Sequence, residues 1–382
     1  MIDRREHDAR LREAAAAIAA ALPVAFLVVG ALRAYPFLDD VNVPAKTPDD
    51  WHTYKQLALS VVRDGVSMPA LSTTYAGLPH GFLYIYFVAL MFAVTGVNST
   101  HVYVVQSFLL GLSISLTYAA IRARVTAVGG LMFLLALTAL MYVDAFRNLT
   151  FKLLSENLYF LLYPLLLIFL YRSVEQDDGA PHESFAAGVL LGLVVLARPS
   201  FVLSAAMLIA AAWIHAVVGR QSLRSPVLLS LGSAIAASGV ALRNYAVARR
   251  ATFDIVTDTS DWLRLWNLPP SDAVIALAKR TLFVFGFTQP IAPQYRLRPH
   301  WMILWLLWAI YPLVRLRRQQ PFEFWELLLY VYVIAYVAPL VLVAADITSY
   351  GGRMVVVILP LLLVPAFRLF FASSSAVTHV RH

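Results

Sequence analysis

The stretch AAAAIAAALPVAFLVVGALRA, residues 14–34, carries no charge between Glu13 and Arg33. A helix needs about 20 apolar residues to cross the ~30 Å hydrocarbon core of a bilayer, so this stretch is long enough to span a membrane. Basic residues precede it, as in a signal peptide, but the apolar run is longer than a typical signal core and no clear cleavage site follows. We therefore expect an uncleaved anchor.

The composition extends this expectation to the whole chain. Of its 382 residues, 60% are hydrophobic and only 14% are charged, and the mean hydropathy is +0.72. This composition cannot supply the charged surface of a soluble enzyme or of a nucleic-acid-binding domain. The chain has no cysteine, which excludes disulfides, thiolate metal sites and cysteine nucleophiles. We predict an all-α polytopic membrane protein that resides in the lipid bilayer and has no nucleic-acid partner.

Ten apolar runs predict about ten transmembrane helices. They lie near residues 14–34, 101–121, 126–143, 157–171, 184–197, 199–218, 226–242, 300–314, 325–345 and 353–371. An eleventh run, Phe82–Val97, is predicted to be a juxtamembrane or re-entrant helix. If it spanned the membrane, the arginine clusters would be scattered over both faces, against the positive-inside rule. With it outside, clusters such as Arg122 with Arg124 fall on the cytoplasmic side, and so do both termini.

This orientation leaves two long extracytoplasmic segments, residues 35–99 and 243–299. We expect residues 1–382 to form a single membrane-embedded domain in the bacterial inner (plasma) membrane, with no soluble C-terminal domain. Because the sizeable hydrophilic surface lies outside the cytoplasm, we expect an extracytoplasmic active site.

Acidic residues gather in the first outer segment, as Asp39 with Asp40 and as Asp49 with Asp50. Asp50 opens the string DWHTYKQLALSVVRDG, which predicts an amphipathic helix on the membrane surface. Its apolar face comprises Trp51, Tyr54, Leu57, Ala58 and Val61. Asp49 or Asp50 suits an N-cap, where a carboxylate satisfies backbone N–H groups. Alternatively, one of them projects into a cavity and acts as a general base. Both interpretations stay open at this point.

Further polar residues gather at the same outer face. They are His80, Arg147, Lys152, Glu156, Arg198, Arg243, Tyr350 and Arg353. Guanidinium and ammonium groups bind phosphate oxygens well, so several converging cations predict an anion site for a lipid headgroup. The alternative is that each cation reaches to the interface or pairs with a nearby acid.

The histidines of the outer segments do not form a recognised metal motif. His52, His80 and His101 show no zinc or iron spacing with Asp49 and Asp50. We predict no metal site and no required cofactor, and leave dependence on a divalent metal open. Gly-rich phosphate loops, GxSxG and HExxH are absent, which excludes nucleotide-driven pumps, serine hydrolases and zincins.

Several short motifs resemble those of the GT-C superfamily of membrane glycosyltransferases, which includes protein O-mannosyltransferases and bacterial aminoarabinose transferases. The matching strings are D-x-x-x-Y-x-x-x-A from Asp50, LPHGFLYIYFVALMFAVTG at 78–96, Ser155-Glu156, G-x-x-x-G-x-x-x-x-x-R-P from Gly188 to Pro199, RNY at 243–245 and the aromatic-to-arginine string at 350–353. The resemblance extends over nearly the full length. It implies a GT-C-like fold in which juxtamembrane helices accompany the spans.

The resemblance also implies an activity. Such an enzyme transfers a sugar, with inversion, from a polyprenyl-phosphate donor to a hydroxyl of an envelope glycan, lipid or protein. The resemblance matches Asp50 to the family's catalytic carboxylate. The family often has a second acid directly after this residue, whereas here Trp51 follows Asp50 and Asp49 precedes it. Asp49 is therefore the alternative base. The implied donor-phosphate ligands are Arg198, Arg243, Arg353, Lys152 and Arg147, and the substrate-pocket candidates are Asp39, Asp40, Tyr54, His80, Tyr84, Glu156 and Tyr350.

The alternative function is a transporter or flippase of lipid-linked sugars. It requires polar residues distributed through the spans, and these are sparse. His215 and Glu326 are the main exceptions.

Overall fold

The structure is a computed structural model of the chain. It describes residues 4–35, 50–65, 82–147, 149–175, 181–198, 201–219, 222–248, 268–285, 288–291, 294–297, 299–320, 322–343 and 356–372. The chain divides into two compact units. Unit 1 comprises residues 1–17, 117–139 and 257–382, and unit 2 comprises residues 18–116 and 140–256. The prediction of a single membrane-embedded domain stays a prediction.

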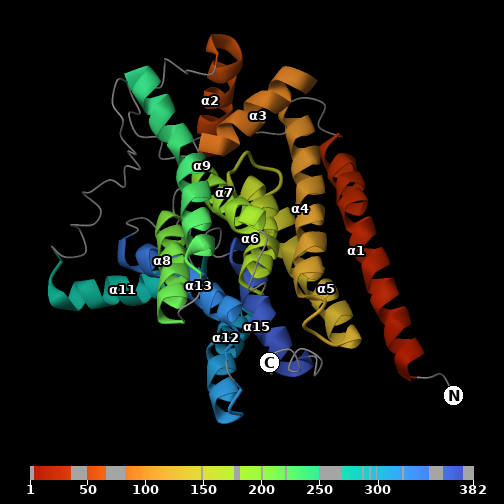
Figure 1. The fold of residues 1–382 in the computed structure, drawn as a ribbon. Coiled ribbons are helices and arrows are strands. Elements are labelled where there is room, and N and C mark those ends of the chain that lie inside the picture. The colour runs from red at the N-terminus through yellow and green to blue at the C-terminus, as the bar shows by residue number, and fades with distance from the viewer. Residues whose placement is uncertain are drawn as a thin grey trace. The chain divides into compact units, whose positions relative to one another are not determined.

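The described residues are helical almost throughout (Figure 1). The helices are α1 (Arg4–Ala34), α2 (Asp50–Asp64), α3 (Phe82–Thr95), α4 (Ser99–Ile121), α5 (Ala127–Met141), the π-helical turn η2 (Tyr142–Phe146), α6 (Glu156–Glu175), α7 (Pro181–Ala197), α8 (Val202–Val218), α9 (Arg224–Ala248), α11 (Pro270–Val284), α12 (Pro299–Arg317), α13 (Phe324–Val343) and α15 (Leu359–Phe371). Strands β1 (Thr288–Ile291) and β2 (Gln294–Leu297) form an antiparallel hairpin, which the sequence patterns do not predict.

Each predicted span overlaps a helix within the described residues, and the all-α polytopic membrane fold is confirmed. Within the described ranges, three helices are long and apolar enough to cross a bilayer: Glu6–Ala34, Ser99–Ile121 and Ala127–Phe146. Others, including α7, α8 and α15, are apolar but shorter. The second outer segment also contains α11 and the β1–β2 hairpin.

In unit 2, the second half of α1 packs closely on α4. A Cβ at Gly30 would overlap the side chain of Ser107, and one at Gly111 would lie 2.6 Å from the carbonyl oxygen of Leu22. Glycine is therefore required at both positions for this approach of the helices.

The same contact compensates for a proline in α1. Pro23 has no N–H, so the carbonyl of Ala19 loses its helical partner. The hydroxyl of Ser115 in α4 donates to this carbonyl at 2.5 Å. A neighbouring helix thus supplies the hydrogen bond that water cannot supply in a bilayer.

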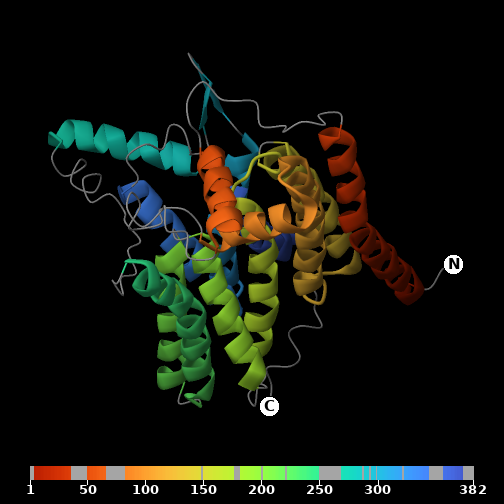
Figure 2. The same ribbon diagram turned by 90° about the horizontal axis from the view of Figure 1, so that it is seen from above.

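Helices α7 and α9 of unit 2 lie side by side (Figures 1 and 2). Their contact is lined by glycines: a Cβ at Gly188 would overlap the backbone of Leu229, and one at Gly192 would lie 2.6 Å from the Cβ of Ala236. Small residues at this spacing let two backbones approach closely, which is how helices gain packing energy in lipid.

The amphipathic helix predicted from Asp50 is confirmed as α2, and its apolar face is buried. Tyr54 is 2% exposed and Ala58 is fully buried. This helix packs against α3, and α3 crosses the N-terminal end of α4 (Figures 1 and 2). Helix α3 has 14 residues, and its juxtamembrane placement stays a prediction.

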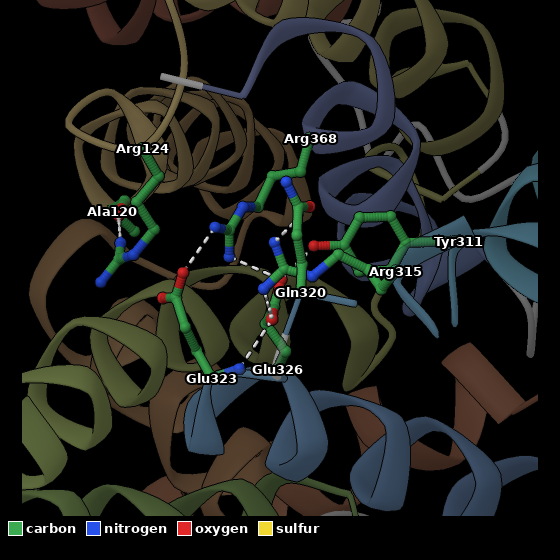
Figure 3. Close-up of polar contacts among 8 residues, drawn as sticks. All are labelled: Ala120, Arg124, Tyr311, Arg315, Gln320, Glu323, Glu326 and Arg368. Carbon is green, nitrogen blue, oxygen red and sulfur yellow. Dashed lines mark hydrogen bonds and ion pairs between the residues drawn. The ribbon is translucent and has the colours of Figure 1, made fainter. Parts of the chain in front are cut away.

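Unit 1 has a buried ionic cluster that joins three helices (Figure 3). Glu326 of α13, 2% exposed, accepts hydrogen bonds from Arg368 of α15 at 2.6 Å and from Arg315 of α12 at 3.2 Å. The hydroxyl of Tyr311 also donates to it. Arg368 additionally donates to Glu323 at 2.6 Å. One carboxylate therefore holds α12, α13 and α15 together.

Other contacts in unit 1 bring three chain segments that carry arginines close together. The guanidinium of Arg12 in α1 donates to the carbonyls of Arg122 at 3.1 Å and Val125 at 3.4 Å. The backbone N–H of Thr126 donates to the carbonyl of Phe371 in α15 at 2.9 Å. The N-terminal part of α1, the turn before α5 and the end of α15 thus meet.

The α7–α9 contact generates a first prediction. We expect Gly188→Ala to lower the free energy of unfolding by about 1–3 kcal/mol, because the added methyl group overlaps the backbone of α9. Gly239→Ala in α9 is the matched control, since nothing lies within 4 Å of a Cβ there; it should be neutral or stabilise by up to about 1 kcal/mol. Unfolding curves in one detergent measure both. Equal stability of the two variants would contradict the packing.

The cluster around Glu326 generates a second prediction. Glu326→Gln keeps the side-chain shape but leaves two buried guanidinium groups short of their counter-charge, so we expect a loss of about 3–5 kcal/mol in unfolding free energy. Glu323→Gln should cost less, because the side chain of Glu323 is 31% exposed and solvent screens the change. Thermal unfolding of both variants in the same detergent tests this order, and a larger loss for Glu323→Gln would reverse it.

Candidate functional site

The candidate site lies in unit 2, where α2 docks on α3. Asp50 is the first residue of α2, and Tyr54 follows one turn later. The ring of Tyr54 meets that of Tyr84 in α3 edge to face, with centroids 5.0 Å apart. Such aromatic pairs contribute about 0.5–1.5 kcal/mol beyond the buried area. This contact therefore fixes the beginning of α2 relative to α3.

Tyr84 is fully buried and connects α3 to the chain that leads into α6. Its hydroxyl donates to Oε1 of Gln106 in α4 at 2.5 Å. The amide nitrogen of Gln106 in turn donates to the carbonyls of Thr150 at 2.7 Å and Lys152 at 3.2 Å. One buried amide thus joins the juxtamembrane helix to the connection between η2 and α6.

A second amide fixes the same connection from its other end. The Nδ2 atom of Asn157, in the first turn of α6, lies 3.2 Å from each of three carbonyl oxygens, those of Leu149, Lys152 and Leu154. A buried backbone carbonyl is costly unless a hydrogen-bond donor pairs with it. Gln106 and Asn157 satisfy these carbonyls, so the connection is held in one conformation.

An ion pair joins the residue that follows this connection to the end of α7. Nη1 of Arg198, at the end of α7, is 2.7 Å from Oε1 of Glu156, the first residue of α6. The side chains are 5% and 0% exposed. Ser155 donates to the other carboxylate oxygen of Glu156 at 3.4 Å. The first residue of α6 is therefore joined to the end of α7 by charges that solvent does not screen.

The connection presents two predicted phosphate ligands at the surface. Arg147 and Lys152 are both exposed, whereas Arg198 is buried against Glu156. On α2, burial lowers the pKa of Lys55 below its usual value, because a low-dielectric surrounding disfavours the ammonium form. The site region thus combines exposed cations, a buried neutralised pair and a partly desolvated lysine.

Several predicted site residues lie outside the described part of the chain. They are Asp39, Asp40, Asp49, His80, Tyr350, Arg353 and the side chains of Asp50 and Arg243. The structure brings together Tyr54, Tyr84, Lys152, Glu156 and Arg198 through the contacts above. The assigned roles of all these residues stay predictions.

The described residues contain no group of three or more His, Asp or Glu side chains that could hold a metal ion. His52 stacks on Trp51 with ring centroids 3.4 Å apart, and His101 lies beside Tyr35 with centroids 6.3 Å apart. Because several outer-segment acids fall outside the described ranges, the question of a divalent metal stays open.

Sequence reasoning missed Gln106 and Asn157. Gln106 is the one amide side chain in the apolar run at 101–121, and Asn157 directly follows the Ser-Glu pair. A buried amide with four hydrogen-bonding positions is costly in a membrane unless it is paired. That cost is the signal that could have marked Gln106 as a structural partner of some irregular backbone.

Comparison with known proteins gives one match. A family model described as dolichyl-phosphate-mannose-protein mannosyltransferase matches residues 79–242, from just before α3 into α9. No curated protein and no solved structure matches significantly. The match confirms the predicted resemblance to GT-C glycosyltransferases and supports a multi-pass membrane glycosyltransferase of this type. It includes Tyr84, Glu156 and Arg198, and begins after α2.

The buried pair generates a third prediction. We expect Glu156→Gln and Arg198→Gln each to lower the free energy of unfolding by about 3–5 kcal/mol, because each leaves an uncompensated buried charge. The double variant should lose clearly less than the sum. The control is Arg172 with Glu183, 3.9 Å apart with Arg172 55% exposed, whose coupling should stay below about 1 kcal/mol. Double-mutant cycles measure both, and additive losses at Glu156 and Arg198 would disprove the coupling.

Proposed function

We propose that this membrane glycosyltransferase moves a sugar from a polyprenyl-phosphate donor to an extracytoplasmic acceptor hydroxyl, with Asp50 as general base. One observation carries the proposal: the beginning of α2 and the connection that bears Arg147 and Lys152 are joined through Tyr54, Tyr84 and Gln106. These contacts join the first turn of α2 to the backbone that bears Lys152, which supports a common site for the proposed base and the cations.

The reaction needs a base and an anion site at fixed separation. Asp50 accepts the proton of the acceptor hydroxyl. At the same time the hydroxyl oxygen of the acceptor bonds to the anomeric carbon, on the face opposite the phosphate. The bond between the anomeric carbon and the phosphate oxygen breaks, which inverts the configuration, and the lipid phosphate leaves with an additional negative charge. Arg147 and Lys152 stabilise that charge, with Arg243 and Arg353 as further donor-phosphate ligands. Asp49 is the alternative base.

Arg198 has a positioning role in this scheme. A guanidinium that is 2.7 Å from a carboxylate and 5% exposed is already neutralised. Its pairing with Glu156 keeps the start of α6 at the end of α7, and so fixes the connection that bears Lys152. The exposed cations, rather than Arg198, then meet the phosphate first.

The remaining substrate-pocket candidates belong to the acceptor side. Asp39, Asp40, His80 and Tyr350 would contact the sugar or the acceptor, which is an envelope glycan, lipid or protein. The proposed orientation in the bacterial inner membrane has both termini in the cytoplasm and the acid-rich outer segments on the opposite face. Contacts of Arg12 with the turn before α5, and of that turn with the end of α15, support a common side for these basic segments.

The structure weakens the transporter alternative, because one of the polar residues on which it depends has a structural role. Glu326, one of two polar exceptions within the spans, accepts hydrogen bonds from Tyr311, Arg315 and Arg368 in unit 1. These contacts account for Glu326 as a structural residue. Among the described residues, no contact favours alternating access over transfer.

The proposed base generates a fourth prediction. We expect Asp50→Asn to reduce sugar transfer on the order of 10²–10⁴-fold, because the amide cannot accept the hydroxyl proton in the transition state. The matched control is Asp64→Asn at the other end of α2, where Asp64 pairs with the exposed Arg63 at 3.0 Å; it should keep full activity. The assay follows radiolabel from a polyprenyl-phosphate sugar into envelope acceptors with purified enzyme.

The outcomes separate the readings. Loss of turnover with donor binding retained supports the transferase and its base. Loss of sugar transfer in Asp49→Asn, with transfer retained in Asp50→Asn, would assign the role of general base to Asp49. Full activity in both variants would remove the assignment, and movement of intact lipid-linked sugar across the bilayer without cleavage would identify a transporter.

A further inference from the structure

The end of α1 contributes a cation to the site region. This cation belongs neither to the family motifs nor to the proposed phosphate ligands. Arg33 lies in the last turn of α1, and its side chain is exposed. The close contacts of Gly30 and Gly111 lock this half of α1 on α4. The position of Arg33 is therefore fixed by packing within unit 2.

Two aromatic rings hold the guanidinium of Arg33. Its central carbon lies 4.9 Å from the ring centroid of Phe151 and 5.5 Å from that of Phe146. A cation over an aromatic face is attracted by the ring quadrupole. Stacking uses the faces of the planar guanidinium, so its in-plane N–H donors remain available to an anion.

These rings are the direct chain neighbours of two other exposed cations. Phe146 precedes Arg147, and Phe151 precedes Lys152. Phe146 is fully buried, and the ring of Phe151 also contacts Tyr103 of α4, with centroids 6.2 Å apart. The rings that hold Arg33 thus lie on the same chain segment as Arg147 and Lys152, directly beside them in the sequence.

The acids of this region do not offset all three charges. Asp144, on η2, is buried and offsets at most one of the three charges, and Glu156 is neutralised by Arg198. Across the described residues, no carboxylate lies within ion-pair distance of Arg33. The surface around Phe146 and Phe151 therefore carries an excess of positive charge suited to a phosphate group.

We infer that Arg33 is a further phosphate-binding residue and that Arg33, Arg147 and Lys152, arranged around Phe146 and Phe151, form one anion site. Its ligand is a lipid-borne phosphate. The inference rests on the proposed function for its source, since the phosphate of a polyprenyl donor and the headgroup of an anionic bilayer lipid share this chemistry.

Direct binding tests the site without requiring turnover. Purified full-length protein in phosphatidylcholine nanodiscs is titrated with polyprenyl monophosphate and, in a separate experiment, with short-chain phosphatidylglycerol. We expect Arg33→Gln to weaken polyprenyl-phosphate binding about 10- to 100-fold, as for loss of a charge-assisted pair. Arg33→Lys should recover part of the affinity, and Phe151→Leu should weaken binding by loss of the stacking ring. Melting temperatures verify that the variants fold.

Two controls make the result specific. Arg10→Gln removes the same charge from the other end of α1, where Arg10 pairs with Glu6, and should bind polyprenyl phosphate like the unaltered protein. Asp50→Asn should also keep its affinity, because the proposed base does not contact the leaving phosphate.

The outcomes distinguish this inference from the proposed function. Equal binding by Arg33→Gln and the unaltered protein overturns the role of Arg33 while leaving the donor intact. Arg33-dependent binding of phosphatidylglycerol alone supports the anion site and overturns the polyprenyl donor. Binding of neither lipid by the unaltered protein overturns both.

Discussion

The structure depends on one constraint: in the hydrocarbon core of a bilayer, no water satisfies a backbone polar group. Two prolines illustrate how the fold meets it. Pro23 frees the carbonyl of Ala19, which the hydroxyl of Ser115 satisfies at 2.5 Å. Pro312 frees the carbonyl of Trp308, to which the hydroxyl of Tyr330 donates at 2.6 Å. In each case a side chain from another helix replaces the lost hydrogen bond, so satisfying the backbone also ties helices together.

The candidate site uses the same solution for a longer stretch of irregular backbone. Gln106 and Asn157 pair with the carbonyls of residues 149–154, which leaves the connection before α6 little freedom. Cations placed on a rigid backbone stabilise developing charge without a reorganisation cost at the moment of reaction. The rigidity of this connection is thus a consequence of these amide contacts, and it suits an anion site.

Buried charge serves different purposes in the two units. In unit 1, Glu326 gathers Tyr311, Arg315 and Arg368 and joins three helices. In unit 2, Glu156 and Arg198 form a pair beside exposed cations. Arginines that look equivalent in the sequence are therefore of two kinds: those neutralised inside a unit, and those such as Arg33 and Arg147 that remain at its surface.

Local composition determined much of this protein. The apolar runs and the helical spacing from Trp51 to Ala58 are short-range properties, and each predicted its helix because hydrophobic length and period act within one segment. The pairing of Glu156 with Arg198, the amide contacts of Gln106 and the stacking of Arg33 on Phe146 and Phe151 join residues far apart in the chain. Only the tertiary structure decided them, because no local pattern specifies which distant partner satisfies a buried charge or amide.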